Sequence, residues 1–66
     1  MRFGARLREL RGQTGLSQEA LAAKAGVHRT YLSGVERGER NISLANLEKL
    51  ARALDVDMST LLEGVD

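Results

Sequence analysis

A chain of 66 residues is long enough for one small domain, which we expect to span residues 1–66, and too short to enclose a sizeable catalytic pocket. With no cysteine and His28 as the one histidine, it lacks the residues for a disulfide or a thiolate zinc site, so we expect no metal and no cofactor. The net charge is only +1, but residues 1–40 hold eight Arg or Lys against four Glu, which indicates either an anion-binding face or ordinary scatter of surface charge.

Apolar residues at helical spacing, and no alternating strand-like runs, predict an all-α fold of five helices. The expected ranges are 2–14, 18–25, 29–37, 44–54 and 58–63. Four starts carry a hydrophobic staple, an apolar residue before the cap and another at the fourth helical position: Leu16 with Leu21, Val27 with Leu32, Ile42 with Leu47, and Val56 with Leu61. The expected caps are Ser17, Ser43, Asp57 and the poorer His28, and the expected left-handed stops are Gly26, Gly38 and Gly64.

No segment of the chain suits a membrane. The longest apolar run, residues 20–23, is far below the ~20 residues that span a bilayer. The N-terminus also lacks the apolar core of a signal peptide. We therefore expect a cytoplasmic protein with no membrane partner.

The second and third predicted helices form a helix-turn-helix over residues 18–36. Leu21 and Ala25 would make the inner face of the first of these helices, and Gly26 supplies the turn because glycine adopts positive φ at little cost. Leu32 and Val35 would fix the second helix to the core. This spacing permits a steep crossing that leaves the second helix projecting from the molecule.

The outward face of the projecting helix is polar. At 100° per residue, Thr30, Ser33 and Arg37 point away from Leu32 and Val35, with Arg29 and Tyr31 on the flanks. Such a face suits the DNA major groove, where Arg recognises guanine, although a merely solvated helix face would share this composition. We expect Arg29 to be the chief base reader, assisted by Thr30 and Ser33.

Gly34 is expected on the same outward face. A side chain there would collide with DNA or block Arg29, unless Gly34 is simply a tolerated surface glycine.

These segments resemble the lambda-repressor-like, or Xre, family of helix-turn-helix regulators. Residues 16–22 (LSQEALA) resemble the first motif helix, residues 27–38 (VHRTYLSGVERG) the recognition helix and its exit turn, and residues 43–51 (SLANLEKLA) the next helix. Within the family, Arg29-Thr30-Tyr31 is similar to the controller proteins of restriction–modification systems, while phage repressors and antitoxins share the pattern. The resemblance implies that Gln18 braces the recognition helix and that Arg11 pairs with Glu36, against the alternative of two independent surface charges.

Phosphate contacts are expected on both sides of the recognition helix. The candidates are Ser17, Gln18, His28, Tyr31, Arg37, Arg40, Asn41 and Ser43. Ser17 and Ser43 also serve as plain caps. For His28, a simple turn histidine is the first interpretation and a phosphate contact the second.

Residues 56–66 are rich in apolar side chains and form the expected dimerisation segment. The candidate interface residues are Val56, Met58, Leu61, Leu62 and Val65, which would otherwise close the core of the monomer. The sequence thus predicts a homodimeric transcriptional regulator that binds a near-palindromic double-stranded DNA operator, with RNA polymerase as a candidate further partner. The alternative is an antitoxin-like module that binds a partner protein, and an enzyme is not expected because no catalytic constellation is present.

Overall fold

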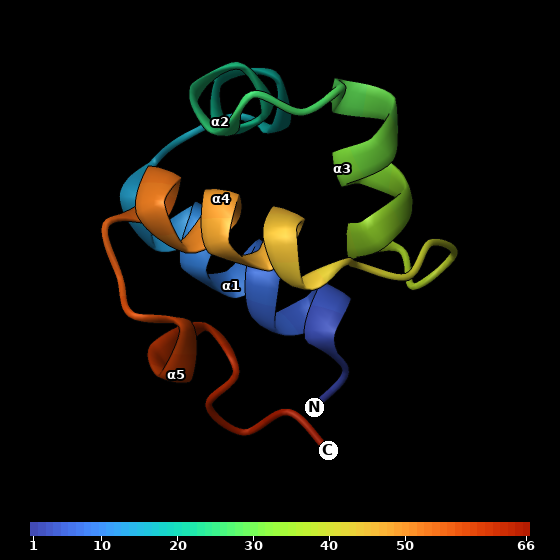
Figure 1. Cartoon of the computed structure of the whole chain (residues 1–66), viewed down its shortest axis with the longest axis vertical. Helices are drawn as coiled ribbons and strands as arrows, with labels where there is room; N and C mark the ends of the chain where they lie inside the picture. Colours follow the sequence, from blue (N-terminus) through green and yellow to red (C-terminus); the bar gives the residue numbers. More distant parts are fainter.

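The computed structural model describes residues 1–66 as five helices and no strands, which confirms the predicted all-α class. The helices are α1 (Phe3–Thr14), α2 (Gln18–Ala25), α3 (Arg29–Glu36), α4 (Leu44–Leu54) and α5 (Met58–Leu61). The bounds of α2 and α4 are as predicted, whereas α1 begins one residue later, α3 ends one residue earlier and α5 ends two residues earlier. In Figure 1, α4 crosses the middle of the molecule, with α2 above it, α3 to its right, and α1 and α5 below it. None of these helices is both long and apolar enough to cross a membrane.

Two of the predicted caps start their helices through hydrogen bonds. The hydroxyl of Ser17 accepts from the backbone N–H of Ala20 at 3.0 Å, and that of Ser43 accepts from the N–H of Asn46 at 3.1 Å. Asp57 occupies the N-cap position of α5, but its side chain accepts no capping hydrogen bond, so this capping prediction is wrong. His28 precedes α3 and likewise makes no capping hydrogen bond.

Gly26 makes the tight turn between α2 and α3. It adopts a φ of 74°, in the left-handed region that favours glycine. Its N–H donates to the carbonyl of Ala23 at 3.3 Å, and the N–H of Val27 donates to the carbonyl of Ala22 at 3.0 Å. Together these bonds satisfy the carbonyls at the end of α2 and redirect the chain into α3.

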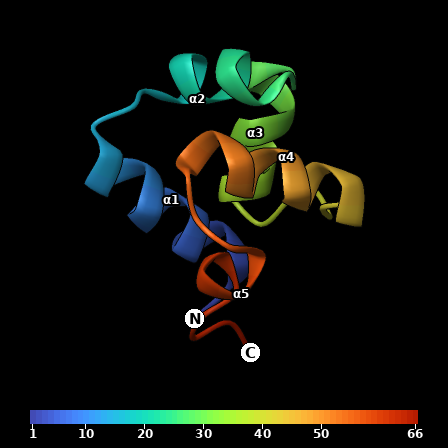
Figure 2. The same ribbon diagram turned by 60° about the vertical axis from the view of Figure 1, so that its left-hand side comes forward.

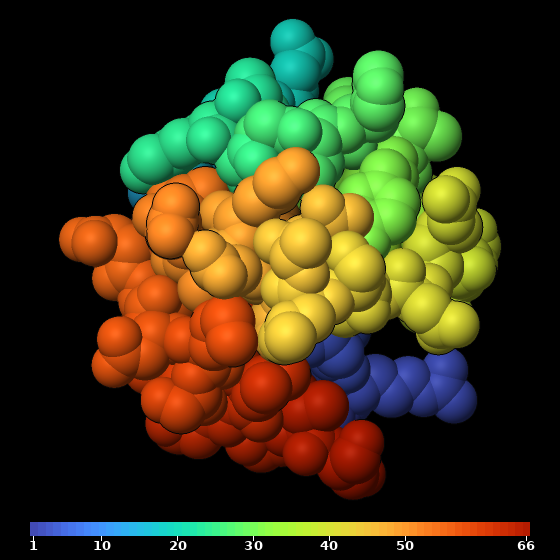
Figure 3. Space-filling view, viewed as in Figure 1, coloured from blue at the N-terminus to red at the C-terminus, as the bar shows by residue number.

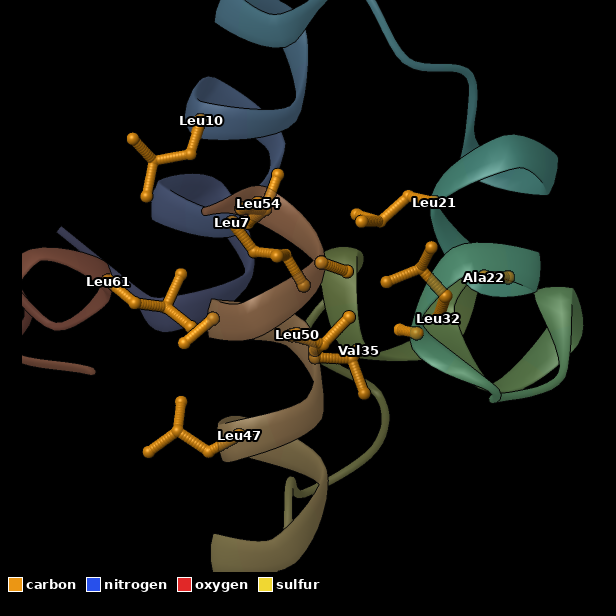
Figure 4. Packing of buried hydrophobic residues seen from close by; sticks show 13 residues of the cluster. Leu7, Leu10, Leu21, Ala22, Leu32, Val35, Leu47, Leu50, Leu54 and Leu61 are labelled. Carbon is orange, nitrogen blue, oxygen red and sulfur yellow. The ribbon is translucent and has the colours of Figure 1, made fainter. Parts of the chain in front are cut away.

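All five helices contribute to one core of 13 buried hydrophobic residues. Figure 4 shows apolar side chains from every helix turned toward a common centre. Five of them, one from each helix, have no exposed surface: Leu7, Leu21, Leu32, Leu50 and Leu61. Because burying a leucine side chain contributes about 1.5–3 kcal/mol, each helix is held by at least one strong apolar contact.

The C-terminal segment closes the core of its own monomer. Leu61 is 0% exposed, so its predicted role at a dimer interface is wrong: it is already covered by the helices of the same chain. Arg6 of α1 holds this segment by donating from Nη2 to the Thr60 carbonyl at 2.7 Å. The ammonium of Met1 pairs with the carboxylate of Asp66, and Figures 1 and 2 both place the two termini side by side.

Candidate nucleic-acid interface

Helix α3 is fixed to the core by one face and leaves the opposite face free. Leu32 and Val35 are 0% and 2% exposed, and they anchor α3 against the rest of the core. On the other side Arg29 and Thr30 are exposed and Ser33 is half-buried. In Figure 1, α3 stands at the edge of the molecule, so the structure brings the three predicted base-reading side chains to an accessible helix face. Their contact with bases stays a prediction.

The side chain of Arg37 folds back along α3 and the following loop. Its guanidinium donates to the hydroxyl of Ser33 and, at 3.1 Å, to Oε1 of Glu39. The hydrogen bond between them, reinforced by the attraction of the two charges, raises the pKa of Arg37 and lowers the pKa of Glu39. In the absence of DNA, the DNA-contact candidates Arg37 and Ser33 are therefore hydrogen-bonded to each other, and the carboxylate of Glu39 lies next to Arg37. Sequence reasoning missed Glu39, whose one signal was its acidic character within the otherwise basic loop 37–41.

A charged network beneath α3 sets its position relative to α1 and α2. The side chain of Glu36 is only 2% exposed and accepts hydrogen bonds from Arg11 of α1 and, at 3.0 Å, from Nε2 of Gln18 on α2. The ion pair expected between Arg11 and Glu36 is thus present, and Gln18 braces the recognition helix through the same carboxylate. This bond uses one of the two N–H groups of the Gln18 side-chain amide, so a phosphate contact at Gln18 would use the other or the backbone N–H.

Gly34 is buried, which contradicts its predicted place on the exposed face. The chain after α3 turns back at Gly38, with φ of 77°, and the N–H of Glu39 donates to the Gly34 carbonyl at 2.8 Å. This return brings the side chain of Arg40 over Gly34 and places its guanidinium carbon 5.4 Å from the centre of the Tyr31 ring. The helical periodicity of α3 alone could not predict that the following loop covers Gly34.

The other phosphate candidates lie on α3 or near it. Ser17 and Gln18 lie at the start of α2, on one side. His28, Tyr31 and Arg40 line a shallow hollow together with Lys49 of α4. Lys49 was not predicted, because nothing in the sequence shows that α4 reaches the turn between α2 and α3.

The loop after α3 continues this surface toward α4. Asn41 is exposed, and its carbonyl accepts from the Tyr31 hydroxyl at 3.3 Å. Ser43 follows as the exposed cap of α4. Figure 3 shows the loop, in yellow, projecting beside α3, in green, and the start of α4. The structure thus places the candidates from the turn, α3 and the loop on neighbouring parts of the surface.

Comparison with known proteins gives consistent matches over most of the chain. The helix-turn-helix family HTH_3 matches residues 7–61. Control protein C.MunI from Mycoplasma sp is 45% identical over 67 residues, covering 100% of this chain and 90% of the relative. The crystal structure of the restriction–modification controller protein C.AhdI from Aeromonas hydrophila is 59% identical and covers 89% of each chain, with a TM-score of 0.88. The structure of SinR, the master regulator for biofilm formation, in complex with DNA is 44% identical and covers 92% of this chain and 98% of that one, with a TM-score of 0.87.

Proposed function

This chain belongs to the helix-turn-helix family HTH_3, and we propose that, as a DNA-binding regulator of transcription, it recognises a near-palindromic operator as a homodimer. Helix α3 enters the major groove, Arg29 reads a base edge, and Thr30 and Ser33 add shorter contacts. The relatives named above are controller proteins and a regulator solved with DNA, which supports this role rather than catalysis.

The observation that carries the proposal is the separation of the two faces of α3. Its apolar face is fully occupied by the core, while Arg29 and Thr30 at its N-terminal end are exposed. Recognition helices of this kind contact bases with their N-terminal residues, and the major groove admits one helix. The loop residues Arg40 and Asn41 then bind the sugar–phosphate backbone and fix the orientation of α3.

A homodimer would use the exposed part of the C-terminal segment. Leu62 is 41% exposed, and Val56, Met58 and Val65 are half-buried, so an apolar surface remains after Leu61 has entered the core. Pairing two copies through this surface would set two α3 helices about 34 Å apart, one turn of DNA, on a two-fold symmetric site.

Selection of bound sequences from random DNA tests the proposal, because the recovered consensus reports specificity, symmetry and half-site spacing together. On that site, Arg29→Ala should cost about 1–3 kcal/mol and relax the preference at one base position. Arg52→Ala is the matched control, since it removes the same charge from an exposed side chain at the far end of α4. Equal losses on the selected site and on random DNA would remove the base-reading role of Arg29.

The alternative function, an antitoxin-like module that mainly binds a partner protein, gives a different result in the same assay. A DNA-binding regulator releases counterions from each neutralised phosphate, so its affinity falls steeply with salt concentration. Absence of any salt-dependent binding to the selected or random duplex would contradict the regulator and favour the protein-binding module.

A further inference from the structure

We propose that Gly34 is a positioning residue for DNA binding: its missing side chain leaves a slot in α3 that holds the stem of Arg40 beside the recognition face. This inference rests on the proposed function, in which Arg40 contacts the DNA backbone. Glycine inside a helix costs about 1 kcal/mol relative to alanine, so helix propensity does not explain the glycine at position 34. The inference explains it by contact with Arg40 and not by direct contact with DNA.

The fit between Gly34 and Arg40 is close. A Cβ atom added to Gly34 would lie 2.7 Å from Cγ of Arg40, 3.6 Å from its Cβ and 3.8 Å from its Cδ. Three successive carbons of the Arg40 stem therefore cover Gly34, and the nearest could not stay in place beside an alanine. Because packed carbon atoms do not approach to 2.7 Å, one methyl group is enough to displace this stem.

The backbone on both sides of the slot is fixed, so the side chain of Arg40 must yield. Gly34 lies within α3, and its own carbonyl accepts from the N–H of Glu39, the residue next to Arg40, at 2.8 Å. Gly38, at φ of 77°, sets the return of the loop. The strain of a methyl group at Gly34 is therefore relieved by rotation of the Arg40 stem away from α3.

The far end of Arg40 is held as well. Its guanidinium carbon lies 5.4 Å from the centre of the Tyr31 ring, within the range of a cation–π contact. Tyr31 in turn donates to the carbonyl of Asn41 at 3.3 Å. Gly34 under the stem and Tyr31 under the guanidinium thus restrict the long, flexible side chain of Arg40 before DNA binds. No acidic residue forms an ion pair with Arg40, so its charge is available to a phosphate.

Gly34→Ala should weaken binding to the selected site and to random DNA alike, by roughly two- to tenfold. This is the cost of ordering one long side chain at the moment of binding, when it is no longer ordered beforehand. The salt dependence should become shallower by up to about one counterion per monomer, as expected for one weakened phosphate contact. Thermal stability should stay equal or rise, because alanine favours the helix. In the NMR spectrum, the resonances of the Arg40 side chain should change as its guanidinium leaves the Tyr31 ring.

The decisive comparison uses Arg40→Ala as a second background. If Gly34 acts through Arg40, Gly34→Ala should have no further effect on affinity once Arg40 is alanine. An equal loss in both backgrounds would overturn the inference and point to direct collision with DNA. Unchanged affinity of Gly34→Ala, or of Arg40→Ala, would also overturn the inference. Failure of the unmodified protein to bind any duplex in a salt-dependent manner would overturn the proposed function itself.

Discussion

Arg11 and Glu36 form a two-pronged ion pair across the contact between α1 and α3, from Nε to Oε2 at 2.7 Å and from Nη2 to Oε1 at 3.0 Å. The hydrogen bond to Glu36 raises the pKa of Arg11, which favours the charged guanidinium. Its Nη1 also donates to the carbonyl of Leu16, just before α2. Arg11 therefore links the end of α3, at Glu36, to the residue just before the start of α2, at Leu16.

Arg11→Met should destabilise the fold by about 3 kcal/mol, measured by urea unfolding. Removing one partner of a buried pair costs about 3–5 kcal/mol because the other charge is stranded. The lower end applies here, since Arg11 is 17% exposed and Gln18 still donates to Glu36. The double variant Arg11→Met, Glu36→Leu should recover much of the loss. Arg52→Met, which breaks the exposed pair with Glu48, should change stability by no more than about 0.5 kcal/mol and serves as the control.

Two glycines of α1 should respond in opposite ways to replacement by alanine. A Cβ on Gly4 would lie 2.4 Å from the carbonyl oxygen of Val35 and 2.5 Å from that of Glu36, so α1 could no longer approach the end of α3. Gly4→Ala should destabilise by about 1–3 kcal/mol, as overpacking does. Gly12 has open space around its Cα, so Gly12→Ala should stabilise the helix by up to about 1 kcal/mol. Melting temperatures shifted in the same direction by both variants would contradict this packing.

The helix starts and the two buried glycines, Gly4 and Gly34, show what the sequence could and could not predict. The starts of α2 and α4 were predictable because a serine cap and its staple act within one helical turn. The resemblance to a known family pointed to Arg11 and Glu36, although 24 residues separate them along the chain. Gly4 and Gly34 were not predictable, since each is defined by a neighbour that only the tertiary fold supplies. The predicted role of Leu61 at a dimer interface was wrong for the same reason. An apolar C-terminal segment has the same sequence pattern whether it packs on its own core or on a partner.

The predicted phosphate contact of Arg37 would put Glu39 in competition with DNA, so Glu39→Gln should raise DNA affinity. The pair of Arg37 and Glu39 is exposed to solvent, which screens its attraction, so the gain in affinity should be modest, up to about fivefold. Because Arg37 lowers the pKa of Glu39, the contribution of the pair persists above the ordinary carboxyl range and is lost only as pH falls through the lowered value. Mild acid therefore does not release Arg37.

The gain from Glu39→Gln has two sources that a second background separates. Removing a negative charge near phosphates helps any DNA binder, and this part should survive in an Arg37→Ala protein. The part due to the freed guanidinium should disappear there. Glu9→Gln removes the same charge from an exposed side chain of α1, where Glu9 pairs with Arg6, and should leave affinity almost unchanged. If the full gain persists without Arg37, the competition does not exist.

Leu62→Glu should convert the proposed dimer into a folded monomer. Light scattering at micromolar concentration should give twice the chain mass of 7.2 kDa for the unmodified protein and the single mass for this variant. The helical circular dichroism should persist, because Leu62 is 41% exposed and the core does not depend on it. Leu61→Glu is the matched contrast one residue away: it places a charge at a site with 0% exposure, which should unfold the chain rather than dissociate it.

The position of the dimer contact can be checked by a second exposed leucine. Leu44, at the start of α4, is 72% exposed and is the one exposed large apolar side chain within the helices. If the C-terminal segment makes the interface, Leu44→Glu should remain dimeric while Leu62→Glu does not, and Leu62→Glu should lose tight binding to a two-half-site operator while keeping weak binding to one half-site. A dimer that survives Leu62→Glu but dissociates in Leu44→Glu would move the interface to α4 and require a different spacing of the two α3 helices.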